Sequence, residues 1–171
     1  IIIGGNDDFA RAQFLAYQDA KALINLTAVD ERFRFGGKED TYTSLLSPVH
    51  PLLFNFGLVG LQVHQTPPDA LHFLTKNNFD TVRLGKSRAA IEETEPVLRD
   101  ADLLAFHLGA LKQSEAPGVA AASPSGFFVE EACQLCRYAG MSDKLTSFGI
   151  YGYCPDLDRD AQTAQAAAQM L

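Results

Sequence analysis

The sequence has no long hydrophobic run, no surplus of positive charge and no cysteine-rich spacing. No apolar run approaches the roughly 18–20 residues that a helix needs to span a bilayer. The 14 basic and 21 acidic side chains give a net charge of −7. This balance argues against nucleic-acid binding and against docking on an anionic membrane, because both need clustered Lys and Arg. Three cysteines without a disulfide pattern fit a reducing compartment, so we expect a cytoplasmic protein.

The composition is that of a globular chain. Hydrophobic residues make up 47% of the 171 positions, enough for a sizeable core, and we expect a single domain over residues 1–171. Residues 1–3 are all Ile, which is typical of the inside of a strand and not of its start. Residues 161–171 favour a helix, but no Gly or Pro follows to end it. We therefore expect this domain to be the later part of a longer chain, incomplete at both ends.

Strand-like and helix-like segments alternate along the chain. Apolar runs predict strands at residues 1–3, 22–29, 55–63, 79–84, 102–108 and 145–153. Helices are expected at residues 10–20, after Pro67, and at 87–99, 128–139 and 161–171, with a long loop or lid at 31–51. Strands separated by helices of this length indicate right-handed crossovers and a mainly parallel sheet. The sequence thus predicts a three-layer α/β/α fold.

Four loops should gather at the carboxyl edge of that sheet. Parallel α/β sheets bind ligands beyond the carboxyl ends of their strands. The rule selects residues 4–9, 30–35, 107–118 and 152–158. Any chemistry is expected there.

The first of these loops has two interpretations. In Gly4-Gly5-Asn6-Asp7-Asp8, an Asp is either projected from the turn toward a metal or ligand, or the segment is a helix entry with Asp7 or Asp8 as its N-cap. A dinucleotide-binding loop would need a further glycine at a spacing that this sequence does not have.

The second and third loops also leave alternatives open. Asp30-Glu31-Arg32-Phe33-Arg34 fits either a catalytic site or an internal ion-pair network. His107, at the end of an apolar run, is either a hydrogen-bonded structural residue or a ligand. Cys133 and Cys136 fall within a predicted helix, where core packing is favoured over a redox role.

Taken together, these loops resemble the ureohydrolase superfamily of arginase, agmatinase and formimidoylglutamase. Residues 3–7 (IGGND) are similar to a strand followed by Gly-Gly-Asp-His, and residues 29–34 (VDERFR) to Asp-Ala-His-Phe-Asp. Residues 104–109 (LAFHLG), continuing to Ala-Pro-Gly at 116–118, resemble a Ser-x-Asp-x-Asp segment. Residues 152–158 (GYCPDLD) resemble Glu-x-Asn-Pro-x-x-Asp, and residues 54–62 (FNFGLVGLQ) are similar to the formimidoylglutamase branch.

The resemblance implies a metal-dependent hydrolase. Members of the family use two manganese ions and a bridging hydroxide to hydrolyse a C–N bond of a linear amidine or guanidine. Carried over position by position, the possible metal ligands are Asp7, Asp30 and His107. The remaining motif positions and their neighbours would line the site: Asp8, Glu31, Arg32, Arg34, Gly109 and Gly152.

Two functional hypotheses follow from these substitutions. In the first, Arg32 and Arg34 take the place of the metals and pair with Asp7 and Asp30, which leaves a catalytically degenerate homologue without metal. In the second, Asp7, Asp30 and His107 hold one divalent ion in an active amidine hydrolase. A nucleotide-binding domain is the weakest alternative.

The resemblance also bears on partners. A small amidine, guanidine or amino-acid ligand is expected, and the chain is expected to form a homo-oligomer. Tyr151, Tyr153, Arg83 and the loop 30–51 are candidates for shaping a pocket for an anionic ligand.

Overall fold

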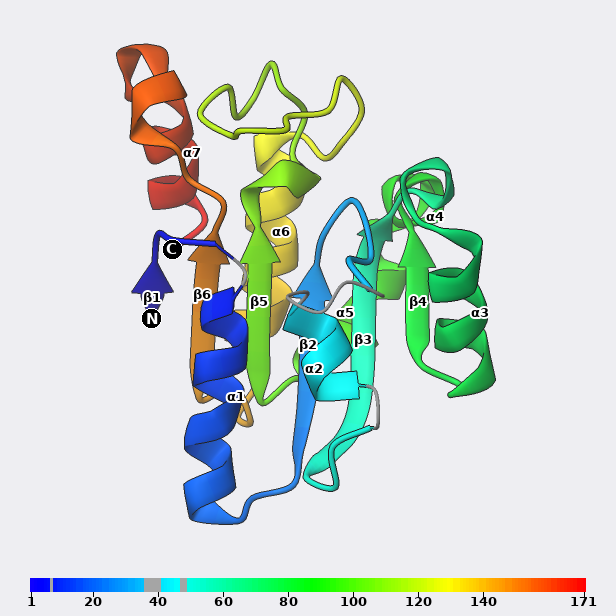
Figure 1. Ribbon diagram of the computed structural model, residues 1–171. Coiled ribbons are helices and arrows are strands. Elements are labelled where there is room, and N and C mark those ends of the chain that lie inside the picture. Colours follow the sequence, from blue (N-terminus) through cyan, green and yellow to red (C-terminus); the bar gives the residue numbers. More distant parts are fainter. Residues whose placement is uncertain (7, 36–40, 47–48) are drawn as a thin grey trace.

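The computed structural model describes residues 1–6, 8–35, 41–46 and 49–171. A six-stranded sheet, in the order β1-β6-β5-β2-β3-β4, crosses the molecule, and every neighbouring pair of strands is parallel (Figure 1). The strands are β1 (Ile2–Ile3), β2 (Ile24–Val29), β3 (Leu53–Leu61), β4 (Asp80–Arg83), β5 (Leu103–His107) and β6 (Ser147–Tyr151). Their arrows all point the same way in Figure 1.

Helices cover both faces of the sheet. The α-helices are α1 (Asp8–Ala20), α2 (Thr41–Leu46), α3 (Pro68–Lys76), α4 (Leu84–Ala89), α5 (Glu95–Arg99), α6 (Val129–Gly140) and α7 (Gln162–Gln169). Single turns of 3-10 helix are η1 (Val63–Gln65), η2 (Ile91–Thr94), η3 (Leu108–Ala110), η4 (Pro155–Leu157) and η5 (Arg159–Ala161). The core on one face includes side chains of α1, α2 and α3, and the core on the other those of α4 to α7. None of the helices in the described ranges is both long and apolar enough to cross a bilayer.

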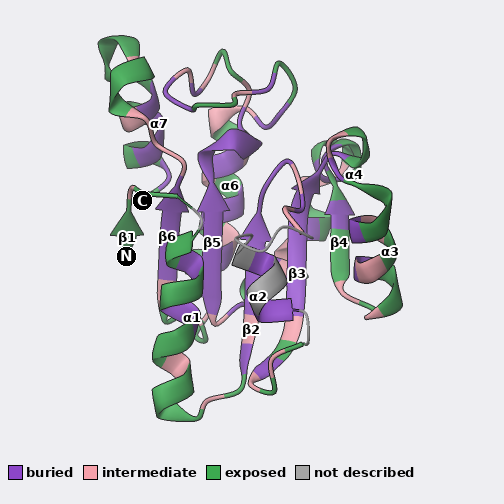
Figure 2. Ribbon diagram, viewed as in Figure 1, coloured by how far each residue is buried: buried purple, intermediate pink, exposed green. Residues whose placement is uncertain are grey.

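Alternation along the strands divides the core into these two halves. In β2, Leu26 and Ala28 face α1 and α2, whereas Val29 belongs to the opposite cluster. In β5, Leu104 and Phe106 belong to the α6 side. Successive side chains of a strand point to opposite faces, and a central parallel strand is covered on both, so β5 is buried throughout (Figure 2).

The predicted three-layer α/β/α architecture with a parallel sheet is confirmed. The helix expected over residues 87–99 is wrong in detail, because the segment divides into the end of α4, η2 and α5. Ala90, with φ −151° and ψ 78°, ends α4. Pro96 lies in the first turn of α5, where its missing N–H costs no hydrogen bond.

Two other elements also differ from expectation. The predicted loop 31–51 contains the short helix α2, although residues 36–40 and 47–48 of it lie outside the described part. The helix expected to stop before Gly140 includes it and ends on Met141 as its C-cap.

Candidate functional site at the carboxyl edge

The parallel register brings two strand ends together. Val29, the last residue of β2, pairs with Phe106 of β5. The residues that follow, Asp30 and Glu31 after β2 and His107 at the end of β5, are therefore neighbours. Asp30 and Glu31 are 0% exposed and His107 is 7% exposed. His107 Nδ1 lies 4.0 Å from Asp30 Oδ1 and 3.8 Å from Glu31 Oε2.

The two ring nitrogens of His107 have different neighbours. Nδ1 accepts a hydrogen bond of 3.0 Å from the backbone N–H of Gly109, which fixes the ring at the start of η3. Nε2 lies 3.3 Å from Nη2 of Arg34. The Nδ1 contact is the one expected if His107 has a hydrogen-bonded structural role, which is one of the two alternatives given by the sequence.

Glu31 carries the closest ion pair of the site. Nη2 and Nε of Arg32 lie 2.6 Å and 2.7 Å from Glu31 Oε1, and Nη2 of Arg34 lies 3.8 Å from the same oxygen. Burial raises the pKa of Glu31 to about 7, with a further increase from Asp30, while His107 and Arg32 lower it. Oε2 of Glu31 accepts no hydrogen bond from any residue in the described ranges.

Two glycines make this close packing possible. A Cβ added to Gly109 would lie 2.7 Å from both Glu31 Oε2 and His107 Nδ1. A Cβ on Gly152 would lie 2.6 Å from His107 Nε2, and Gly152 has φ +86°, a conformation that favours glycine. Any larger residue at either position would have to displace the imidazole or the carboxylate.

A pocket of about 370 Å³ opens above these groups. Its described walls are Gly5, Asn6, Arg32, Arg34, His107, Val119, Ala120, Ala121, Gly152, Tyr153 and Cys154. Among the site residues predicted from sequence, Arg32, Arg34, His107 and Gly152 line it, whereas Asp30, Glu31 and Gly109 do not. The buried carboxylates thus lie behind the two arginines and the histidine.

The first predicted loop contributes less than expected. Asp8 lies exposed in the first turn of α1, where its carboxylate accepts a hydrogen bond of 2.7 Å from Asn6, and it is not among the pocket-lining residues. Asp7 lies outside the described residues. The proposed pairing of Arg32 and Arg34 with Asp7 therefore stays a prediction, and the ion pairs described for these arginines go to Glu31.

Sequence reasoning missed one wall of the pocket. Val119, Ala120 and Ala121 directly follow Gly118, the last residue of the third predicted loop. Of the pocket-shaping candidates, Tyr153 does line the pocket. Tyr151 is buried and donates its hydroxyl to Gln13, and Arg83 lines a different pocket beside β4.

Asp158 ties together the loops that frame the pocket. Its carboxylate accepts hydrogen bonds from the N–H of Thr163 at 2.8 Å and of Ala164 at 3.0 Å, and from the hydroxyl of Tyr153 at 3.1 Å. Gly118 N–H donates to Thr163 Oγ1 at 2.7 Å. Although partial burial works in the opposite direction, these hydrogen bonds hold the pKa of Asp158 below its usual value.

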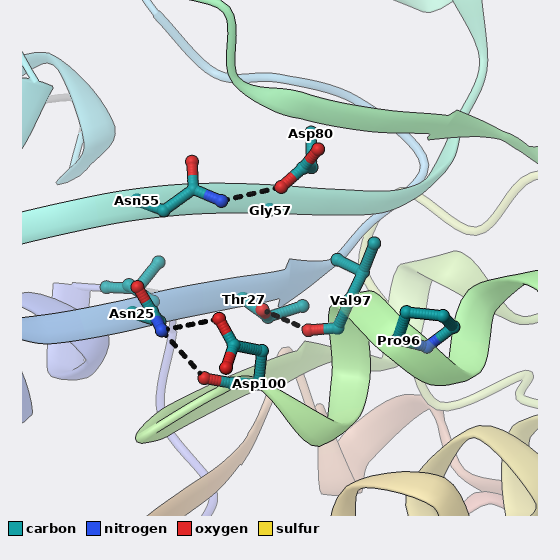
Figure 3. A pocket seen from close by; sticks show the side chains of 9 residues that line it. Asn25, Thr27, Asn55, Gly57, Asp80, Pro96, Val97 and Asp100 are labelled. Carbon is teal, nitrogen blue, oxygen red and sulfur yellow. Dashed lines mark hydrogen bonds between the residues drawn. The ribbon is translucent and has the colours of Figure 1, made fainter.

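A second pocket, of about 340 Å³, lies near the amino ends of β2, β3 and β4 (Figure 3). Its polar groups bond to one another or to the nearby backbone. The Asn25 amide donates to Asp100 at 2.7 Å, the Asn55 amide donates to Asp80 at 2.5 Å, and the Thr27 hydroxyl donates to the Val97 carbonyl at 3.1 Å. Its described walls contain no His, Cys, Lys or Arg, so the carboxyl edge is the better candidate site.

A family model described as the arginase family matches residues 61–171. The chain belongs to the arginase family. The formimidoylglutamase of Staphylococcus haemolyticus is 22% identical over 182 residues, which cover 99% of this chain and 58% of that protein. The chain therefore spans just over half the length of this relative.

Solved structures of arginase-family proteins share the fold. The formimidoylglutamase of Bacillus subtilis superposes with a TM-score of 0.86 at 20% identity, over 99% of this chain and 57% of that one. A Trypanosoma cruzi formiminoglutamase with Mn²⁺ superposes with a TM-score of 0.88 at 18% identity, over 98% and 61%. The resemblance to the formimidoylglutamase branch is thereby confirmed for the fold.

The described residues do not fit a pair of manganese ions. Asp30, Glu31 and His107 form the one group of three potential ligands found in the described ranges, with donor atoms within 4.8 Å of one another. Two hard cations need more carboxylates and imidazoles than this set supplies. Moreover, the Glu31 carboxylate is engaged by Arg32, and His107 Nε2 faces Arg34.

Proposed function

We propose that this chain is an arginase-family protein in which an internal ion-pair network has replaced the hydrolytic metal centre. The contact between Arg32 and Glu31, at 2.6 Å, carries this proposal. A buried carboxylate needs a counter-charge, and here a guanidinium supplies it. Hydrolysis of amidines or guanidines by the family mechanism is then lost, while the fold is kept.

Electrostatics support this choice. Arg is protonated at every physiological pH, so any cation that shares the Glu31 carboxylate meets the charge of Arg32. Arg34, 3.8 Å from the same oxygen, adds a second positive charge. Repulsion between charges a few ångströms apart is strong in a partly buried site, and it disfavours a divalent ion there.

A second candidate function is hydrolysis of a small amidine or guanidine with a single divalent ion. Asp30, Glu31 and His107 have donor atoms within 4.8 Å of one another, and three protein ligands suffice for such a site. This set contains Glu31, in addition to the Asp30 and His107 expected from sequence. When bound, such an ion would activate a water molecule for attack on the amidine carbon.

Metal content separates the two candidates. The purified protein is incubated with Mn²⁺, desalted and analysed for bound manganese. Formamide and urea release are then assayed with formimino and guanidino substrates. We expect no bound manganese and no product. About one ion per chain, lost in His107→Ala and accompanied by product release, would instead establish the mononuclear hydrolase.

A further inference from the structure

We propose that the carboxyl-edge pocket binds a small organic monocarboxylate through the guanidinium groups of Arg32 and Arg34. This proposal rests on the proposed function, because a metal ion at Glu31 and His107 would change the charge of the same pocket. The ligand would lie over the arginines, between the Val119–Ala121 segment and the loop of Gly152 and Tyr153.

The charge of the pocket wall is opposite to that of the protein. The protein has a net charge of −7. Among the described wall residues, the two that carry a permanent charge are Arg32 and Arg34, and none is acidic. Low-dielectric walls focus such a field, so this pocket attracts anions although the protein as a whole repels them.

Arg32 has donors to spare. A guanidinium carries five N–H groups. Nε and Nη2 are directed at Glu31, and Nη2 also lies 3.4 Å from the Ala121 carbonyl oxygen. No group in the described ranges accepts a hydrogen bond from Nη1, and the side chain is 29% exposed. Its outer N–H groups can therefore bind a carboxylate, the partner whose geometry a guanidinium matches best.

Arg34 supplies a second cationic group on the same wall. Its side chain is 26% exposed and lines the pocket, and its Nη2 lies 3.3 Å from His107 Nε2. The ion pairs of Arg34 and Arg32 to Glu31 hold both guanidinium groups in place before a ligand arrives. Such preorganisation reduces the entropic cost of binding.

The surroundings select a monoanion with an apolar body. Asp30 and Glu31 lie buried behind the arginines, so their negative charge offsets part of the positive charge and disfavours a second negative charge on the ligand. An ammonium group on the ligand would be repelled by the guanidinium groups. Val119, Ala120 and Ala121 offer apolar contact, and about 370 Å³ suits a ligand of a few carbon atoms.

Isothermal titration with hexanoate tests the proposal, and hexanamide serves as the uncharged probe of the same shape. We expect hexanoate to bind and hexanamide to bind at least about tenfold more weakly, as for a lost charged hydrogen bond. Equal binding of the two compounds, or no detectable hexanoate binding by folded protein, would overturn the proposal.

A matched pair of variants isolates Arg32. Arg32→Gln alone would leave Glu31 buried without its partner, so the change is made in a Glu31→Gln background. The single variant Glu31→Gln keeps the guanidinium of Arg32 and serves as the reference for the second change. The double variant Glu31→Gln/Arg32→Gln should bind about tenfold more weakly than that single variant, and equal affinity of the two would contradict the proposal.

Two further titrations decide the remaining alternatives. Inorganic phosphate that binds as tightly as hexanoate, with the same dependence on Arg32, would overturn the assignment to monocarboxylates. Titrations with and without Mn²⁺ and EDTA separate this proposal from the proposed function. Hexanoate binding that EDTA abolishes would overturn the metal-free function, whereas absence of both manganese and hexanoate binding would overturn the carboxylate site alone.

Discussion

Strand β2 has polar side chains at both ends, and the two ends handle them differently. Near its amino end, Asn25 and Thr27 hydrogen-bond to Asp100 and to the Val97 carbonyl, beside a pocket whose two carboxylates, Asp80 and Asp100, are exposed and half-buried, respectively. Just beyond its carboxyl end, Asp30 and Glu31 are buried completely. The carboxylates near the amino end are thus accessible to water, whereas those beyond the carboxyl end are not.

The difference shows which end of the sheet constrains the sequence. A buried charge without a partner costs several kcal/mol, whereas exposed polar pairs contribute little. At the carboxyl end, the buried groups restrict the residues around them. Glu31 needs Arg32 as a counter-charge, and His107 accepts a hydrogen bond from Gly109 and leaves no room for a side chain at position 152. Substitutions there are therefore expected to cost more than substitutions around Asn25.

The largest effect is expected from Arg32→Ala. Removing the guanidinium leaves the Glu31 carboxylate buried without its closest ion pair, which should lower the free energy of unfolding by about 3 kcal/mol. Thermal and chemical denaturation at pH 8, where Glu31 is mostly ionised, measures this loss. Arg99→Ala is the matched control, because Arg99 is half exposed and its pair with Glu95 should contribute less than about 1 kcal/mol.

The double variant Glu31→Gln/Arg32→Ala sharpens this prediction. If the cost arises from the uncompensated carboxylate, neutralising Glu31 should restore most of the lost stability. Unchanged melting in Arg32→Ala would contradict the ion-pair network and, with it, the contrast between the two ends of β2.

The pH dependence of stability should also distinguish the carboxyl end. The pKa of Glu31 is raised from 4.5 to about 7 in the folded protein, so between these values the folded state binds more protons than the unfolded state. The free energy of unfolding should therefore fall as the pH rises above about 4.5 and level off above about 7. At about 1.4 kcal/mol per pH unit the total contribution is about 3 kcal/mol.

Comparison of the wild type with Glu31→Gln isolates this contribution. Between pH 4.5 and 7, the free energy of unfolding should fall by about 3 kcal/mol less in the variant than in the wild type. A difference between the two proteins that does not change with pH would show that Glu31 titrates normally.

A smaller effect is expected from Gly109→Ala. Its Cβ would approach Glu31 Oε2 and His107 Nδ1 to 2.7 Å, and such overpacking costs about 1–3 kcal/mol. Gly85→Ala in α4 is the control, since a Cβ there meets nothing within 4 Å and alanine favours a helix. Denaturation of the two variants should give changes of opposite sign, and equal changes would contradict the close packing of the site.

Much of the fold could be predicted from the sequence because the strands are strongly apolar. The runs ending at Val29 and His107 are buried on both faces, and such runs indicate a parallel sheet. The break between α4 and α5 is not predicted, although Pro96 is a signal for a helix that begins at that point. The short helix α2 is not predicted, although Tyr42, Leu45 and Leu46 have helical spacing, because six residues within a polar segment are too few for the pattern to stand out.

The site could be predicted only in part. The loops after β2 and β5 are placed by topology, so Asp30 and His107 could be expected near one another, whereas Glu31 is expected only to line the site. Which carboxylate Arg32 engages depends on loop conformation, and the observed partner is its neighbour Glu31. Sequence spacing does not reveal such a pair. Nor does it reveal that Gly109 donates its N–H to His107.

The smallest effect is expected at the amino end, from Asn55→Ala. The Asn55 amide donates to Asp80 in an exposed part of the second pocket, where water can replace the lost partner. The free energy of unfolding should change by about 0.5 kcal/mol or less, and neither its pH dependence between 4.5 and 7 nor hexanoate binding should change. Denaturation curves of this variant beside Arg32→Ala test the contrast directly. If Asn55→Ala instead lowered the free energy of unfolding by about 3 kcal/mol, the cost of removing a polar partner would not depend on its exposure. Polar partners at the two ends of β2 would then contribute equally to stability.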